Sequence, residues 1–266
     1  MGSRLHIQAA RSLRLTTGYT TMSDTATAEQ AGPGLFARAL GIVVSPTETF
    51  RPIVARPRSV GILFLVCLLM AIGNGVPQLT ERGQQAALTA SVQQVERFTG
   101  QPVSPEQHAA MAQTAGINGY ITMGSMFVFI PVATVFFSAL YWALFNVVLG
   151  GTATFGQVLS VTSHSQVISG LGALLGLPIQ MFQGTFSQAG PFNLGALAPM
   201  VDPASGLALF LGAVTFFGLW QSVVCGLGLG VLYKRAPVGI VIGLLVIYLG
   251  TTALFTVGLS SVMGGN

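Results

Sequence analysis

The stretch "SVGILFLVCLLMAIGNGVP", residues 59–77, contains no charged residue and is long enough to cross a lipid bilayer. A helix rises about 1.5 Å per residue and the hydrocarbon core is about 30 Å thick, so a span needs roughly 20 apolar residues. Four more stretches satisfy this requirement, and the five spans are expected at about 59–77, 120–149, 157–181, 205–233 and 236–263. The predicted fold class is therefore all-α, a polytopic integral membrane helical bundle with five transmembrane helices.

The composition supports a membrane protein and argues against a soluble one. Of the 266 residues, 52% are hydrophobic and only 7% are charged, a balance that a hydrated surface cannot sustain. The formal charge is +4, but the eleven basic residues lie beside apolar segments and form no basic face, so no nucleic-acid partner is expected. Cys67 and Cys225 both lie in apolar stretches and predict neither a disulfide framework nor a metal site.

The positions of the basic residues predict the orientation of the chain. An odd number of spans places the termini on opposite sides, and Lys and Arg concentrate on the cytoplasmic side of membrane proteins. With the N-terminus inside, nine of the eleven basic residues are cytoplasmic and only Arg82 and Arg97 are outside. We therefore expect a multi-pass protein of the cell membrane with a cytoplasmic N-terminus and an external C-terminus (N-in/C-out).

The segment before the first span divides into a tail and an amphipathic part. Residues 1–32 are polar and irregular, and we expect them to be disordered. Within the tail, residues 1–21 hold three arginines and no acid and precede a second methionine, which favours an over-called start over a transit peptide. Residues 33–58 predict two cytoplasmic interfacial amphipathic helices, and Ser45 with Glu48 predicts a capping box for the second. Packing beneath the bundle is a second interpretation of these helices, and both interpretations can hold together.

The longest segment between spans, residues 78–119, predicts an extracytoplasmic helical hairpin. Apolar residues recur at helical spacing between positions 88 and 95. Ser104 and Pro105 open a second helix, which Gly116 is expected to end.

No motif in the sequence indicates catalysis. All seven Asp and Glu residues lie outside the five predicted spans, which argues against a carboxylate-coupled pump. His6, His108 and His164 lie in the tail, the outer loop and a span, so no metal-ligand cluster is visible. Neither an "HExxH" nor a "GxxxxGK" motif occurs. We therefore expect no catalytic, cofactor-binding or metal-binding residues, and a protein that is not an enzyme.

Small residues at intervals of four predict close packing of the last three spans. This spacing lets helix backbones approach each other within a membrane. The pairs and rows are Gly172 with Gly176, Ser222 with Gly226 and Gly230, and Gly239 with Gly243. Spans three to five are therefore expected to form a compact bundle.

The stretch "SVTSHSQVIS", residues 160–169, places His164 and Gln166 inside the third predicted span, while Gln221 and Thr251 lie in the fourth and fifth. One hypothesis is a midplane polar pocket that binds a substrate, with His164 as a proton acceptor near neutral pH. The alternative is hydrogen bonding between helices, which contributes about 1 kcal/mol per pair. The alternative is favoured because His164 has no charged partner within the predicted spans.

Three stretches share a pattern that covers roughly residues 35–260. They are "ALGIVVSPTETFRPIVARPRSVGILFLVCLLMAIGN", "GGTATFGQVLSVTSHSQVISGLGALLGLP" and "FFGLWQSVVCGLGLGVLYKRAPVGIVIGLLVIYLG". They combine an amphipathic lead-in with Ser-Pro before the first span, a Gly-Gly turn with an aromatic residue entering the third, and a tryptophan with small residues before a short turn and the last span. This pattern resembles the Yip family, the Ypt/Rab-interacting membrane proteins with five spans.

The resemblance implies five helices, a cytoplasmic N-terminus and a non-enzymatic membrane role. Eukaryotic relatives assist vesicle traffic and contact small GTPases. Here ten Arg to one Lys, with abundant Ala and Gly, is typical of GC-rich bacterial genes, and indicates a bacterial-type member in the inner membrane, without a Rab partner. The resemblance carries over no catalytic residues.

The function that follows is a non-enzymatic integral membrane protein that organises membrane or protein partners. The expected partners are the lipid bilayer and an unidentified membrane protein or a second copy of this chain. The alternative is a small-solute transporter or channel with a midplane polar pocket. No cofactor is expected in either case.

Overall fold

The computed structural model describes residues 34–183, 190–202 and 205–258 of the chain. The chain divides into two compact units, residues 1–38 and 39–266, and nearly all of the described residues belong to the second. The tail predicted to be disordered and the last residues of the fifth predicted span lie outside the described part.

Within the described residues the chain is helical and contains no β-strand. Five helical stretches are long and apolar enough to cross a membrane, which confirms the predicted all-α membrane fold; they are Val60–Leu79, Pro105–Val148, Phe155–Gln183, Phe216–Tyr233 and Pro237–Thr256. In chain order the elements are α2 (Leu35–Val44), α3 (Pro46–Ala55), α4 (Val60–Gly75), η1 (Val76–Leu79), α5 (Glu81–Thr99), α6 (Pro105–Trp142), η2 (Ala143–Val148), α7 (Phe155–Ser165), α8 (Val167–Gln183), η3 (Leu194–Leu197), α9 (Gly206–Ala213), α10 (Phe216–Tyr233), α11 (Pro237–Ala253) and η4 (Leu254–Gly258).

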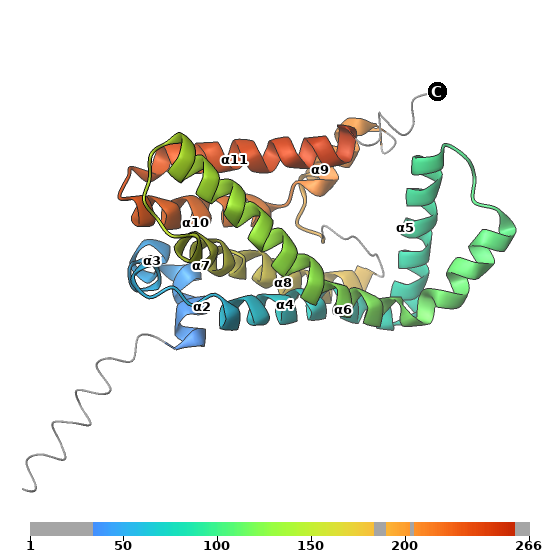
Figure 1. Cartoon of the computed structure of the whole chain (residues 1–266). Helices are drawn as coiled ribbons and strands as arrows, with labels where there is room; N and C mark the ends of the chain where they lie inside the picture. Colours follow the sequence, from blue (N-terminus) through green and yellow to red (C-terminus); the bar gives the residue numbers. More distant parts are fainter. Residues whose placement is uncertain (1–33, 184–189, 203–204, 259–266) are drawn as a thin grey trace, which may run out of the picture. The chain divides into compact units, whose positions relative to one another are not determined.

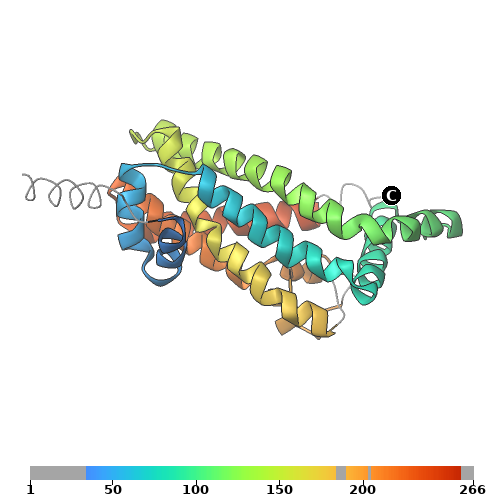
Figure 2. The same cartoon turned by 90° about the horizontal axis from the view of Figure 1, so that it is seen from below.

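The spanning helices lie along one another and form a bundle with two distinct ends (Figures 1 and 2). The contacts are most extensive between α10 and α11, between α4 and α6, and between α4 and α8. Helix α3 and the turn between α10 and α11 lie at one end of the bundle, which we call the α3 end. Helices α5 and α9 lie at the other, the α5 end, where α5 turns away from the bundle (Figure 1).

Helix α3 begins where the sequence predicts but without the predicted capping box. Ser45 is the residue before the helix and Pro46 occupies its first position, yet the Ser45 side chain makes no capping hydrogen bond. Glu48 instead forms an ion pair with Arg51, at 2.9 Å. Proline fixes φ near its helical value, so Pro46 favours a helix that begins at this position even without a side-chain cap.

The apolar face of α3 packs on the bundle. Phe50 is completely buried and Ile53 nearly so, because α3 contacts both α7 and α10. Gly228 on α10 makes the close approach possible, since a Cβ there would lie 2.6 Å from Cγ1 of Val161 and 2.8 Å from the Phe50 ring. Packing on the bundle, the second interpretation that the sequence left open for this segment, therefore describes α3.

Helix α6 is longer than predicted and joins the hairpin that it forms with α5 to the second span without a break. It runs for 38 residues from Pro105, after a capping box in which Ser104 and Gln107 exchange side-chain and backbone hydrogen bonds. Gly116, the predicted end of the outer helix, lies inside α6. A glycine inside a helix costs only about 1 kcal/mol relative to alanine, a cost that the apolar helix following it offsets.

The fourth predicted span, residues 205–233, is divided into α9 and α10, and the prediction of one continuous span is wrong. Val214 and Thr215 between them are extended. The N–H of Leu194 donates to the carbonyl oxygen of Val214 at 2.9 Å, and Asn193 forms an isolated antiparallel bridge with Thr215. These bonds satisfy backbone groups of the break that would otherwise pair inside a helix. The fourth span therefore consists of α10 alone.

Candidate functional site

The polar side chains of α7 are buried among its neighbours. Ser160, Ser163, His164 and Ser165 have no exposed surface, and Thr162 is nearly as buried, because α7 packs against α3, α6 and α10. The Nδ1 atom of His164 lies 2.7 Å from the carbonyl oxygen of Ser160, one turn earlier. Since a carbonyl oxygen only accepts, Nδ1 carries the proton in this contact. The imidazole is thus bonded to its own helix within a closed interface.

Gln166 lies between α7 and α8 and bonds the third span to α6. Its side-chain Nε2 donates to Oγ1 of Thr134 at 2.8 Å. The Thr134 hydroxyl donates in turn to the carbonyl oxygen of Ile130 at 2.6 Å. Because Thr134 is fully buried, this chain of hydrogen bonds joins two helices in a closed contact.

Gln221 and Thr251 make separate contacts on α10 and α11. The Ser169 hydroxyl on α8 donates a short hydrogen bond to Oε1 of Gln221. Thr251 donates to a carbonyl oxygen of its own helix, one turn earlier, at 2.8 Å. Gln221 is thus bonded to α8, and Thr251 is bonded to its own helix.

The four glycines of the candidate site, Gly172, Gly176, Gly226 and Gly230, all lie where another segment comes close. A Cβ at Gly172 would overlap the ring of Phe217, and one at Gly226 would lie 2.6 Å from Cγ2 of Val241. The nearest neighbours of a Cβ at Gly176 and Gly230 are Pro191, at 2.9 Å, and Pro237, at 3.1 Å. A Cβ would therefore displace a neighbouring segment at Gly172, Gly176 and Gly226, whereas at Gly230 it would make a tight contact.

The third predicted pair, Gly239 and Gly243 on α11, does not pack within this chain. A Cβ at either position would meet no atom within 4 Å. The spacing of the pair is correct for a helix contact, but the pair lies on a side of α11 that no described segment covers. The prediction that this pair holds α11 to the bundle is therefore wrong.

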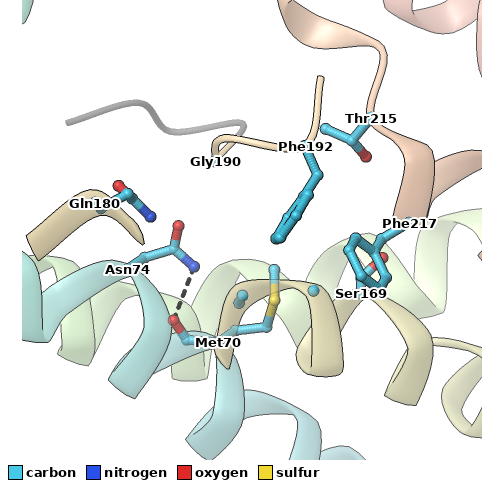
Figure 3. Close-up of a pocket in the computed structure, with 10 residues that line it drawn as sticks. Met70, Asn74, Ser169, Gln180, Gly190, Phe192, Thr215 and Phe217 are labelled. Carbon is cyan, nitrogen blue, oxygen red and sulfur yellow. Dashed lines mark hydrogen bonds between the residues drawn. The ribbon is translucent and has the colours of Figure 1, made fainter. Parts of the chain in front are cut away.

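A cavity of about 130 Å³ lies between α4, α8, the start of α10 and the segments before it (Figure 3). Asn74 donates from Nδ2 to the carbonyl oxygen of Met70 at 2.9 Å, and its side chain lies beside that of Gln180 on one side of the cavity (Figure 3). Phe217 lines the opposite side. Of the eight predicted residues only Gly172 lines this cavity.

Sequence reasoning missed the two carboxamides of this cavity. Asn74 lies in the predicted first span, in "AIGNG", and Gln180 lies near the end of the predicted third. The signal was available, because a carboxamide inside an apolar span requires a hydrogen-bond partner. Both side chains are at most 9% exposed.

A second cavity, of about 380 Å³, lies at the α3 end between the turn at residues 150–153 and the turn at residues 232–235. None of His164, Gln166, Gln221 and Thr251 lines it or the cavity near Asn74. Within the described part of the chain, no group of three or more His, Cys, Asp and Glu residues is placed to hold a metal ion.

The fold and the buried polar contacts define an integral membrane protein whose five spanning helices are held together by small residues and interhelix hydrogen bonds. A family model, the Yip1 domain, matches residues 40–265, and the chain belongs to this family. Membrane protein YknW of Bacillus subtilis (strain 168) is 26% identical over 238 residues, which cover 87% of this chain and 93% of YknW. No solved structure matches. The resemblance predicted from the sequence is thereby confirmed.

Proposed function

We propose that this chain is a non-enzymatic integral membrane protein that organises membrane or protein partners. The proposal depends on one observation: polar side chains in the spans form hydrogen bonds within the protein. His164, Gln166 and Gln221 bond to neighbouring helices or backbone and line neither described cavity. Side chains engaged in this way contribute to packing, at about 1 kcal/mol per pair, and are not placed to bind and release a substrate.

Two helices offer the surface for partners. In the spans that contain α6 and α11, only 11% of the residues in the most apolar stretch are buried inside the protein, against 39% in each of the other three spans. Phe129, Val132 and Phe136 are among the exposed residues of α6. Such a surface contacts either lipid chains or the helices of a partner, which is an unidentified membrane protein or a second copy of this chain.

Photocrosslinking in native membranes tests the proposal. A benzoylphenylalanine at Phe129 or Phe136 should yield protein adducts of one defined mass, whereas the same residue at the buried Phe145 should yield none. An adduct of twice the chain's mass identifies a second copy as the partner. Lipid adducts alone at both exposed positions would contradict a protein-organising role.

The proposal includes an N-in/C-out orientation in the cell (inner) membrane. Five basic residues lie in residues 39–58 and 234–235, at the α3 end, and two lie in the outer segment 78–119. This distribution favours a cytoplasmic α3 end. Cysteines introduced at the exposed Gln101 and Thr152 report the orientation. A membrane-impermeant maleimide should label the first in intact cells and the second only after permeabilisation, and the reverse result would refute the orientation.

The cavity near Asn74 is the observation that favours the alternative function, a small-solute transporter or channel. Its volume of about 130 Å³ is below the 300–1,000 Å³ that is usual for ligand pockets. A transported solute would therefore be limited to a few heavy atoms, and solute uptake by reconstituted vesicles is the direct assay.

A further inference from the structure

The cavity at the α3 end has a polar lining that the proposed function does not use. It is formed by the turn after η2 and by the turn that joins α10 to α11. Six of its lining residues are Gly151, Thr152, Gln157, Tyr233, Lys234 and Arg235. Gln157 also donates from Nε2 to the carbonyl oxygen of Val54 at the end of α3, at 3.1 Å, so the cavity adjoins the docked α3 helix.

Hydrogen bonds connect the two turns that form the walls of this cavity. The carbonyl oxygen of Ala153 accepts from Nε1 of Trp142 at 3.1 Å and from Nδ2 of Asn146 at 2.6 Å. The Tyr233 hydroxyl donates to Oδ1 of the same Asn146 at 3.0 Å. The Tyr233 ring stacks on Phe145, with centroids 4.9 Å apart. The two turns are thus fixed to each other, so a ligand would enter a preformed site.

Two cations line the cavity, and neither forms an ion pair with any residue in the described part of the chain. Arg235 donates from Nη2 to the carbonyl oxygen of Leu149 at 3.0 Å, a contact that fixes the guanidinium but does not neutralise it. The one acid of the nearby α3, Glu48, is paired with Arg51. The remaining charge of the cavity is therefore positive, as an anion-binding site requires.

The backbone at Lys234 supports a role for this side chain beyond solubility. Lys234 is the only described residue other than glycine with a positive φ, at φ 52° and ψ 42°. It follows the last turn of α10, and its N–H donates to the carbonyl oxygen of Gly230. Glycine is the usual residue at such a left-handed helix end because it has no Cβ to strain the backbone. A lysine here keeps a charge beside the cavity at the expense of backbone strain.

The surroundings of the cavity indicate where its anion comes from. Val147, Val148 and Val238 flank the two turns in sequence and are about two-thirds exposed or more. Tyr233 and Trp142 lie at the same end of their helices, the level at which such rings occupy the membrane interface. A ligand with a charged head and apolar chains would contact all of these groups at once.

We propose that this cavity binds the phosphate headgroup of an anionic phospholipid, with Lys234 and Arg235 as the groups that contact the phosphate and the three exposed valines against the acyl chains. The guanidinium of Arg235 presents paired N–H groups that match phosphate oxygens, and Lys234 adds a point charge. Charge alone attracts an anionic membrane by about fivefold per cation, so the test must separate a built site from general surface attraction.

The test uses the full chain in nanodiscs of phosphatidylcholine with a titrated fraction of phosphatidylglycerol, and native mass spectrometry to count phosphatidylglycerol that stays bound. Lys234→Gly should lower retention about tenfold while the melting temperature stays equal or rises, because glycine relieves the left-handed backbone. Thr152→Trp keeps both cations but fills the cavity, and should lower retention to a similar extent. The Lys234→Gly/Arg235→Gln double variant should abolish it.

The matched control is Arg56→Gln/Arg58→Gln, which removes two cations from the same end of the bundle without changing the cavity lining. This control removes general surface attraction but no contact at the site, so its loss of retention should be clearly smaller than that of the Lys234/Arg235 double variant, and an equal loss would overturn the proposal. Inorganic phosphate at millimolar concentration, added in pure phosphatidylcholine discs, tests the other source of the anion. Binding of inorganic phosphate without retention of phosphatidylglycerol would refute the lipid assignment.

Discussion

The contact between α10 and α11 depends on Gly226, and Gly226→Ala measures that dependence. The new Cβ would lie 2.6 Å from Cγ2 and 2.9 Å from Cα of Val241. The second atom belongs to the backbone, so a side-chain rotation cannot relieve the overlap and α11 has to move. Overpacking of this kind costs about 1–3 kcal/mol. Replacing a helical glycine by alanine stabilises by about 1 kcal/mol, which leaves a net destabilisation of roughly 0–2 kcal/mol.

Gly243→Ala on α11 is the control that separates the steric cost of Gly226→Ala from the gain in helix propensity. Gly243 also lies inside a helix, but a Cβ there meets no atom within 4 Å, so this variant receives the helix-propensity gain without the overlap. The free energy of unfolding of the two variants should therefore differ by about 1–3 kcal/mol, with Gly226→Ala the less stable. Reversible unfolding of the purified chain in mixed micelles measures the difference. Equal stabilities would refute the close contact at Gly226.

Three further substitutions test the buried contacts. His164→Leu removes the bond to Ser160 and should lower the free energy of unfolding by about 1 kcal/mol, with the crosslinking pattern of α6 unchanged; loss of that pattern in a folded variant would restore a functional role for His164. Thr134→Val leaves the half-buried carboxamide of Gln166 without its acceptor and should cost about 1–3 kcal/mol in the same unfolding assay. Phe50→Ala should cost about 3–5 kcal/mol and expose α3 to limited proteolysis, whereas an unchanged digestion pattern would contradict the docking of α3.

The number and approximate position of the spans could be predicted because an apolar stretch of sufficient length has few alternatives in a bilayer. The break in the fourth predicted span could not, because it depends on bonds from the 192–194 segment to Val214 and Thr215, which are distant in sequence. At Gly116 the sequence predicted a helix end that the structure does not contain. A residue that often ends helices remained inside α6, since the residues on both sides of it continue the helix.

The candidate site shows what residue spacing can and cannot predict. Spacing identified Gly172, Gly176, Gly226 and Gly230, each of which faces another segment closely. The same spacing at Gly239 and Gly243 predicted a contact that this chain does not make, because a small-residue pair permits close approach but does not say which helix approaches. Both cavities escaped prediction because each is formed by segments that meet only in the folded chain.

The length of α6 has a mechanical consequence. At about 1.5 Å per residue, its 38 residues extend for roughly 57 Å, nearly twice the thickness of the hydrocarbon core. Pro131 lies within the helix without ending it, and within the described residues no loop separates the α5–α6 hairpin from the membrane-spanning half of α6. A displacement of the α5–α6 hairpin therefore acts on the helix surface inside the bilayer through one continuous helix, which bends along its length (Figure 1).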